Sequence, residues 1–97
     1  MTNYYLTEIA EQDIDDIVSY IAVENKNAAL KLLDSLFKSL AMLAENPMMG
    51  HERPDLTNKP VRFWPFKAHY LIVYSYDFPI KVVRVLSGYR DISSLLV

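Results

Sequence analysis

Cysteine is absent from this chain, and glycine occurs only twice. Small secreted domains usually need disulfides because their cores are small, so 97 residues without cysteine are expected to work in the reducing cytoplasm. The N-terminus lacks the basic region and apolar block of a signal peptide. No apolar run approaches the roughly 18–20 residues that a membrane-spanning helix needs. We therefore expect a cytoplasmic protein without a membrane segment.

The scarcity of cysteine, histidine and glycine also argues against several kinds of site. His51 and His69 are 18 residues apart, and neither cysteines nor an HExxH motif accompany them. A metal site is therefore not expected. Gly50 and Gly88 are too far apart to form a phosphate-cradling loop. We expect no metal and no cofactor.

Basic charge is limited and uneven. The formal net charge is −2, with −5 in residues 1–46 and +3 in residues 47–97. Non-specific binding to nucleic acid needs many clustered cations, so neither this nor direct sequence-specific DNA binding is expected. The more basic second half could still meet phosphate or an acidic partner segment.

The length allows one domain, residues 1–97, and 52% hydrophobic residues are enough to fill its core. A β-prone run at residues 3–6 precedes an amphipathic helix, which Thr7 is expected to cap. Apolar residues then recur at helical spacing, namely Ala10, Ile14, Ile17, Val18 and Ile21. Four carboxylates are expected on the solvent-facing side of this helix: Asp13, Asp15, Asp16 and Glu24.

A second helix follows almost at once. Residues 25–27 (NKN) interrupt the first pattern and can cap the next helix, and Asn46-Pro47 ends it, because the residue before proline avoids the α region. Between them a leucine-rich stripe keeps helical spacing, with Ala29, Leu32, Leu33, Leu36, Phe37, Leu40, Leu43 and Ala44. Two long helices with a tight connection predict an antiparallel hairpin.

Three β-type runs follow a proline-containing loop at residues 46–60. They span residues 61–66, 69–76 and 80–87, and their short connections predict an antiparallel meander. Pro65 would remove a ladder hydrogen bond, so it indicates an edge strand or a bulge. The predicted fold is therefore α+β, in the order β-α-α-β-β-β, with the helical hairpin on one face of a mainly antiparallel sheet.

Neither face of this sheet is cleanly polar. In the last strand, alternation places Ile80, Val82, Arg84 and Leu86 on one side and Lys81, Val83, Val85 and Ser87 on the other. Since the hairpin covers only one face, the second should form a shallow apolar and aromatic groove that seats a partner. Candidate partner contacts are Tyr70, Tyr74, Tyr76, Arg84 and Arg90. The alternative is that long side chains and the C-terminal tail cover this face.

The arginines are the candidates for chemistry. With Tyr89 and His69, the side chains of Arg62, Arg84 and Arg90 could assemble a metal-free ribonuclease site, in which guanidinium groups steady a pentacovalent phosphate. Alternatively, Arg84 and Arg90 form structural ion pairs with Asp91, Asp77 or a helix carboxylate. The residues leave both interpretations open for Arg84, while Arg90 and Asp91 are expected to fasten the C-terminal segment.

Across nearly its whole length the chain resembles the RelE/ParE superfamily of bacterial toxins, and its ParE branch in particular. The resemblance lies in LTEIAEQDIDDIVSYIA, a leucine-rich helix ending at NP, NPMMGHERPDL, VRFWPF, HYLIVYSY and IKVVRVLSGYRDI, in this order. It implies a toxin of a type II toxin–antitoxin module. Its partner would be a cognate antitoxin, typically a ribbon-helix-helix protein whose C-terminal segment wraps the toxin.

The two branches of the superfamily imply different targets. ParE-like toxins are described as poisoning DNA gyrase, whereas RelE-like relatives cleave mRNA on the ribosome and tend to be strongly basic. A sequence pI of about 5.6 favours the ParE branch. Many relatives carry a histidine where this chain has Ser87, and Tyr89, with an ordinary pKa near 10, is a poor substitute base.

The leading interpretation is a gyrase-binding toxin without catalysis of its own. One alternative is a metal-independent, ribosome-associated mRNA endonuclease that uses Arg62, Arg84 and Tyr89. Another is a degenerate toxin that only binds antitoxin.

Overall fold

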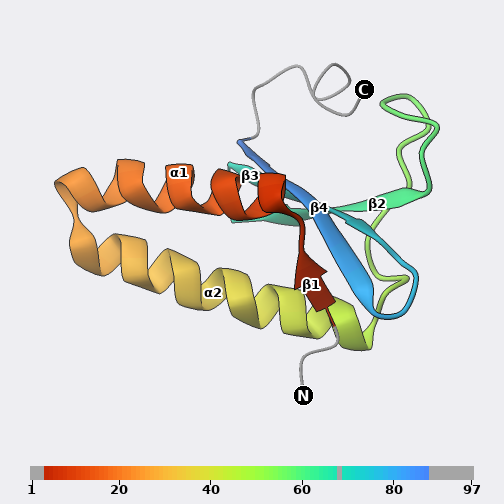
Figure 1. Cartoon of the computed structure of the whole chain (residues 1–97), viewed down its shortest axis with the longest axis horizontal. Coiled ribbons are helices and arrows are strands. Elements are labelled where there is room, and N and C mark those ends of the chain that lie inside the picture. The colour runs from red at the N-terminus through yellow and green to blue at the C-terminus, as the bar shows by residue number, and fades with distance from the viewer. Residues whose placement is uncertain (1–3, 68, 88–97) are drawn as a thin grey trace.

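A helical hairpin lies against one face of a four-stranded sheet in the computed structural model, which describes residues 4–67 and 69–87 (Figure 1). In chain order the elements are β1 (Tyr4–Leu6), α1 (Glu8–Glu24), α2 (Lys26–Glu45), β2 (Val61–Phe66), β3 (Tyr70–Ser75) and β4 (Ile80–Ser87). The predicted α+β fold and the predicted order of elements are confirmed. No helix in these two ranges is long and apolar enough to cross a membrane.

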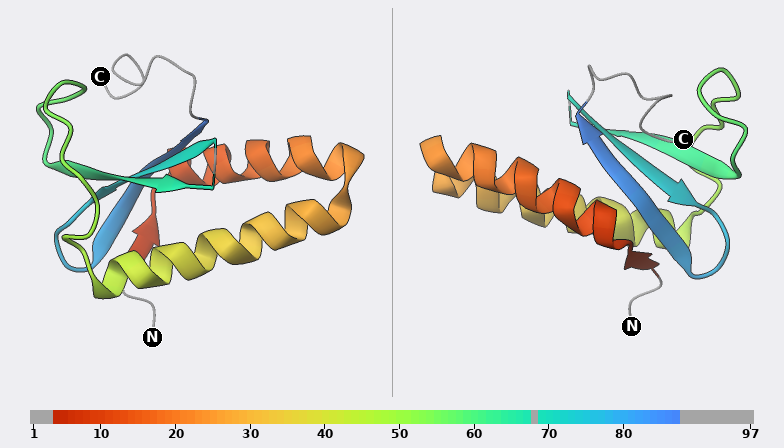
Figure 2. Two further views of the ribbon diagram at one scale, coloured as in Figure 1. Left: turned by 180° about the vertical axis from the view of Figure 1, so that it is seen from behind. Right: turned by 45° about the horizontal axis from the view of Figure 1, so that its top comes forward.

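The sheet has the strand order β1-β4-β3-β2. Strands β2, β3 and β4 form the expected antiparallel meander, while β1 pairs in parallel with the start of β4, from Tyr4 opposite Ile80 to Leu6 opposite Val82. The two helices run side by side across the same face, and they extend beyond the sheet at the end where they are joined (Figure 2).

Two polar residues define the hairpin. The Thr7 hydroxyl accepts a hydrogen bond from the Ala10 amide at 3.0 Å, which caps α1, and donates to the Val83 carbonyl at 3.0 Å, which ties the helix start to β4. Asn25 caps both helices. Its backbone N–H donates to the Ile21 carbonyl at the end of α1, and its side-chain oxygen accepts a hydrogen bond from the Ala28 amide at the start of α2. The sequence signals for both caps are confirmed.

The main core lies between the hairpin and the sheet. Its buried members are Ala10, Ile14, Leu36, Leu40, Leu43, Ala44, Phe66, Ile72, Tyr74, Ile80, Val82 and Val85. Tyr74 and Ile72 are fully buried here, so the tyrosine-bearing face of β3 is the face that the helices cover. The hydrophobic effect acts mainly across this layer.

The second face of the sheet carries a smaller cluster. Val61, Phe63, Val73 and Leu86 are buried there, and Leu56 from the loop before β2 packs on them with Leu71 and Val83. Because Val73 is fully buried, the centre of this face is not the open groove that the alternation predicted. The alternative was that long side chains and the C-terminal tail cover this face; Leu56 does pack on it, and the tail lies outside the described residues.

A β-bulge in β4 explains why alternation failed in that strand. Val73 stands opposite Arg84, but the next residue, Tyr74, stands opposite Val82, so Val83 is an extra residue. A bulge reverses which face the following side chains reach. Consequently Val85 packs with the helix-side core, whereas Leu86 packs on the opposite face. The prediction that placed Arg84 and Leu86 on one face with Ile80 and Val82 is wrong for this reason.

The outer edge of β2 is closed by its neighbours. His51 and Phe63 exchange both backbone hydrogen bonds, at 2.8 and 2.7 Å, and the Val61 amide donates to the Lys59 carbonyl at 2.8 Å. Pro65 has no N–H to offer at the next outward position. The prediction of an edge position for Pro65 is confirmed, and such an edge is a poor template for another strand.

A tyrosine fixes the loop that follows α2. The Tyr74 hydroxyl accepts a hydrogen bond from the Gly50 amide at 2.8 Å and donates to the Pro47 carbonyl at 2.7 Å. Burial raises the pKa of Tyr74 above its ordinary value, although the Gly50 hydrogen bond and the charge of Arg62 oppose this. A Cβ at position 50 would lie 2.5 Å from the Tyr74 hydroxyl, so the close approach requires glycine.

We expect Gly50→Ala to lower the free energy of unfolding by about 1–3 kcal/mol, because the added methyl group overpacks the Tyr74 contact. Tyr74→Phe should cost about 1–2 kcal/mol, because it leaves the Gly50 amide unpaired. In the double variant the loss of unfolding free energy should be smaller than the sum of the two single losses, since Tyr74→Phe removes the hydroxyl oxygen that lies closest to the new Cβ. Urea unfolding measures all three, with Tyr5→Phe at a half-exposed position as the control. A double-variant loss equal to the sum of the two single losses would contradict a direct contact between Gly50 and Tyr74.

Candidate functional site

Arg84, in the middle of β4, is paired with a carboxylate of α1. Its Nε donates to Asp13 Oδ2 at 2.8 Å and its Nη2 to Asp13 Oδ1 at 2.9 Å, which is the bidentate geometry that guanidinium groups favour. The two side chains are only 16% and 12% exposed. The structure thus supports the structural alternative for Arg84, an ion pair with a helix carboxylate.

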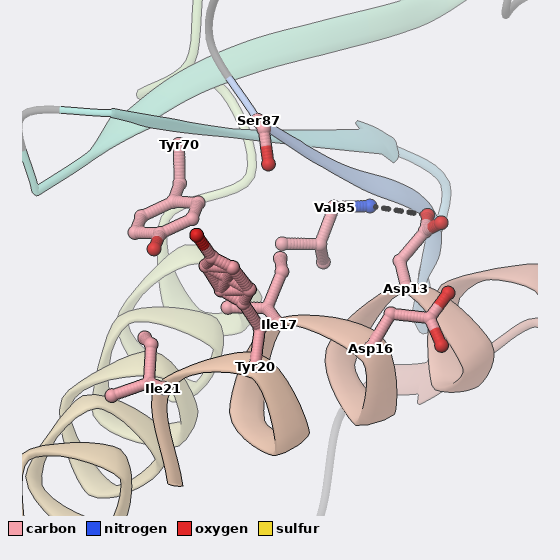
Figure 3. Close-up of a pocket in the computed structure, with 8 residues that line it drawn as sticks. All are labelled: Asp13, Asp16, Ile17, Tyr20, Ile21, Tyr70, Val85 and Ser87. Atoms are coloured by element: carbon pink, nitrogen blue, oxygen red, sulfur yellow. Dashed lines mark hydrogen bonds between the residues drawn. The ribbon is translucent and has the colours of Figure 1, made fainter. Parts of the chain in front are cut away.

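The same carboxylate also binds the backbone of β4. Because β1 pairs only with Ile80 to Val82, it does not reach the later part of β4. There the Val85 amide donates to Asp13 Oδ2 at 3.0 Å (Figure 3). The Asp13 side chain therefore bonds the edge of β4 just beyond the residues that the backbone of β1 pairs with.

Asp13 corrects one prediction from the sequence. We expected it on the solvent-facing side of α1, but it is mostly buried against β4. The signal was present, since Asp13 lies three residues after Ala10 and four before Ile17, within the apolar stripe. A carboxylate at such a position, together with an arginine in an apolar strand, indicates a buried pair.

The electrostatics of the pair are those of a permanent contact. The hydrogen bonds that Arg84 donates to the Asp13 carboxylate raise the pKa of Arg84 above its already high ordinary value, and burial opposes this only in part. A raised pKa of a basic group stabilises the folded state at every pH below the unfolded pKa, which for arginine lies far above neutral pH. The guanidinium therefore stays charged, and its N–H groups on Asp13 are not available to a phosphate.

Arg62 is held elsewhere, by the loop after α2. Its Nη1 donates to the Gly50 carbonyl at 2.7 Å and to the Met48 carbonyl at 3.4 Å, and its Nη2 lies 3.5 Å from Glu52. The guanidinium carbon lies 5.0 Å from the centre of the Tyr76 ring, a cation–π distance. Arg62 Nε is buried without a hydrogen-bond partner among the described residues.

The two arginines do not converge. Arg62 stands opposite Tyr74 and Arg84 opposite Val73, and successive residues of β3 point to opposite faces. The predicted arrangement in which both guanidinium groups steady one phosphate is therefore not formed by these two residues. Of the other proposed members of that arrangement, His69 is exposed just before β3, while Tyr89 and Arg90 lie outside the described residues, as does Asp91.

The three candidate partner tyrosines have different surroundings. Tyr74 is fully buried with its hydroxyl bonded, which removes it from any surface of the isolated chain. Tyr76 is half-buried beside Arg62. Tyr70 is half-buried, with its ring centre 6.2 Å from that of Phe66, and it borders a groove.

That groove lies between α1 and the ends of β3 and β4, and has a volume of about 330 Å³ (Figure 3). Its lining comprises Asp13, Asp16, Ile17, Tyr20, Ile21, Tyr70, Val85 and Ser87. The sequence pattern proposed Tyr70 as a partner contact, and it did not single out Asp16 and Tyr20, the helix residues that line the groove beside it. Within the described ranges, no three histidine or carboxylate side chains are close enough to hold a metal ion. The groove offers apolar, aromatic and acidic contacts, which suit binding.

Replacing Asp13 tests the pair. Asp13→Asn should lower the free energy of unfolding by about 2–4 kcal/mol, because the largely buried Arg84 guanidinium would lose the charged carboxylate of α1. Asp15→Asn removes the same charge from an exposed position of the same helix and should cost less than about 0.5 kcal/mol. Chemical denaturation compares the two. Equal, small losses of unfolding free energy in the two variants would mean that the Asp13–Arg84 pair adds no stability.

The comparisons with known proteins agree with this architecture. The family model described as the ParE toxin of the type II toxin–antitoxin system parDE matches residues 4–92. A solved structure described as the chromosomal ParDE TA system from P. aeruginosa contains a similar chain, with 20% sequence identity and a TM-score of 0.73. The match covers 90% of this chain and 96% of that chain, and at this identity it shows a shared fold. No curated protein matches. This chain belongs to the ParE toxin family of type II toxin–antitoxin systems.

Proposed function

We propose that this chain is a toxin that acts by binding DNA gyrase in the cytoplasm and that a cognate antitoxin neutralises it. The observation that carries the proposal is the state of Arg62 and Arg84, the two described arginines that an RNA-cleaving site was expected to use. Arg84 is bonded to Asp13, and Arg62 is bonded to the carbonyls of Gly50 and Met48. Their contacts support roles in folding and in shaping a binding surface.

Two further features support binding over RNA cleavage. Ser87 stands where many relatives of the superfamily carry a histidine, and a serine hydroxyl does not titrate near neutral pH. The chain is also acidic overall, with a pI of about 5.6, so attraction to the phosphates of ribosomal RNA would be weak.

The antitoxin is proposed from family membership and from the similar chain in a ParDE system. The resemblance implies a ribbon-helix-helix protein with a C-terminal segment that wraps the toxin. Segments that order on a partner bury large surfaces. The groove beside α1 and the half-exposed tyrosine Tyr70 give such a segment a place to bind.

The purified chain should inhibit supercoiling by purified gyrase and accumulate cleaved DNA complexes, and a stoichiometric amount of antitoxin should relieve both effects. The assay measures DNA topology over a range of toxin concentrations, with heat-unfolded chain as the control. Unchanged supercoiling at concentrations that arrest growth would contradict the proposal.

Induction of the chain in cells separates the alternatives. Under the proposal, growth arrest is accompanied by SOS induction and filamentation while total mRNA stays intact. Rapid cleavage of translated mRNA would instead identify a RelE-like endonuclease. Normal growth, with antitoxin binding retained, would identify a degenerate toxin.

A further inference from the structure

The helical hairpin extends past the end of the sheet (Figure 2). The groove lies between α1 and the sheet near that end (Figure 3). Its floor is apolar, with Ile17 and Ile21 from α1 and Val85 from β4. Its rim is polar, with Asp16 and Tyr20 on the helix side and Tyr70 and Ser87 on the sheet side. The groove therefore offers an apolar seat beneath a polar rim.

Asp16 and Tyr20 both border the groove, with the Asp16 carboxylate on the side of Asp13 and the Tyr20 ring on the side of Tyr70 (Figure 3). They are four residues apart on α1, so they lie one turn apart on the same side of the helix. Tyr20 is 77% exposed, and its ring extends towards Tyr70 across the groove (Figure 3). Asp16 is exposed, and its Oδ1 accepts a hydrogen bond from the neutral Gln12 side chain at 2.8 Å.

The described residues that line the groove carry charge of one sign only. Helix α1 contains six carboxylates and no basic residue, as its sequence EIAEQDIDDIVSYIAVE shows. Arg84 compensates Asp13, but the bond that Asp16 receives from Gln12 carries no charge. None of the eight described residues that line the groove is basic. The groove therefore presents one negative charge that the described lining does not balance.

A guanidinium group matches this combination. It pairs with a carboxylate through its planar fork of N–H groups and stacks on aromatic rings, and its aliphatic stem can lie along apolar surface. An ammonium group can pair with Asp16 but does not stack as well on Tyr20. The chemistry of the groove thus favours arginine over lysine.

The edges of the sheet indicate how such a partner would approach. The outer edge of β2 is closed by His51, the Lys59 carbonyl and Pro65, and the Val85 amide on the edge of β4 is bonded to Asp13. Addition of a partner strand at these points would require breaking existing hydrogen bonds. Side-chain insertion into the groove requires none of this.

We propose that the groove holds an arginine side chain of the antitoxin, with the guanidinium on Asp16 and stacked on Tyr20, and with Tyr70 closing the opposite side. The proposal rests on the proposed function, because it assigns the occupant to the antitoxin.

The test is calorimetric titration of the whole chain with the antitoxin encoded beside it. Asp16→Asn should weaken binding about tenfold at low salt, because an ion pair that a partner covers is desolvated. Asp15→Asn, which removes an exposed carboxylate one residue away, should weaken binding less than about twofold. The difference should shrink at high salt. Urea unfolding of both variants checks that each is folded.

A double-mutant cycle identifies the partner residue. Each antitoxin arginine is changed to glutamine and titrated against wild type and Asp16→Asn. One arginine should weaken binding about tenfold against wild type and have little further effect against Asp16→Asn. Equal losses for Asp15→Asn and Asp16→Asn, or the absence of any coupled arginine, would overturn the proposal. Two further outcomes would overturn the proposal, because each would show that this chain itself occupies the groove. In one, removal of residues 88–97 strengthens arginine binding. In the other, the Asp16 effect is lost through self-association.

A separate measurement distinguishes failure of this inference from failure of the proposed function. Arginine amide is titrated into the labelled chain, and NMR shifts of the Tyr20 and Tyr70 rings are recorded, with citrulline amide as the neutral control. If the ring signals shift with arginine amide but not with citrulline amide, and the shifts disappear in Asp16→Asn, the result supports the groove chemistry even if gyrase proves not to be the target. Equal shifts with both amides would overturn it, whatever the supercoiling assay shows.

Discussion

The carboxylate of Asp13 is the contact on which the arrangement of helices and sheet depends. It receives two hydrogen bonds from Arg84 and one from the Val85 amide, and so joins α1 to β4 beyond the point where β1 ends. A methyl group or an amide at this position could not satisfy all three donors. The position of α1 against β4 in turn defines one wall of the groove beside it. The same residue therefore serves the fold and the shape of the candidate binding surface.

Most of the fold could be predicted from the sequence because its signals are local. The caps at Thr7 and Asn25, the helix end at Asn46-Pro47 and the edge position of Pro65 each follow from one or two residues. The pairing of β1 with β4 could not be predicted in this way, since three residues carry little pattern. The bulge at Val83 was also missed, because it arises from the register between two strands and leaves no mark in either sequence.

The candidate site was harder to predict, and the reason is physical. Arg84 was singled out correctly as unusual, but its partner lies 71 residues away in sequence, and alternation placed it on the wrong face. Tyr74 was assigned to a partner surface, although the helices bury it. Exposure depends on which face the hairpin covers, and both faces of this sheet carry apolar residues. A strand with one polar face would have settled that choice from the sequence alone.

Asn25 has a consequence for how chains of this architecture can change in length. One residue ends α1 and begins α2, so the hairpin contains no loop that could absorb an inserted residue. Each residue added to a helix turns all later side chains by about 100° around its axis. A single insertion in either helix would thus rotate the apolar stripe away from the sheet on one side of the change. A change of length within the helices that keeps the apolar stripe in place would therefore have to add about whole turns to both helices together.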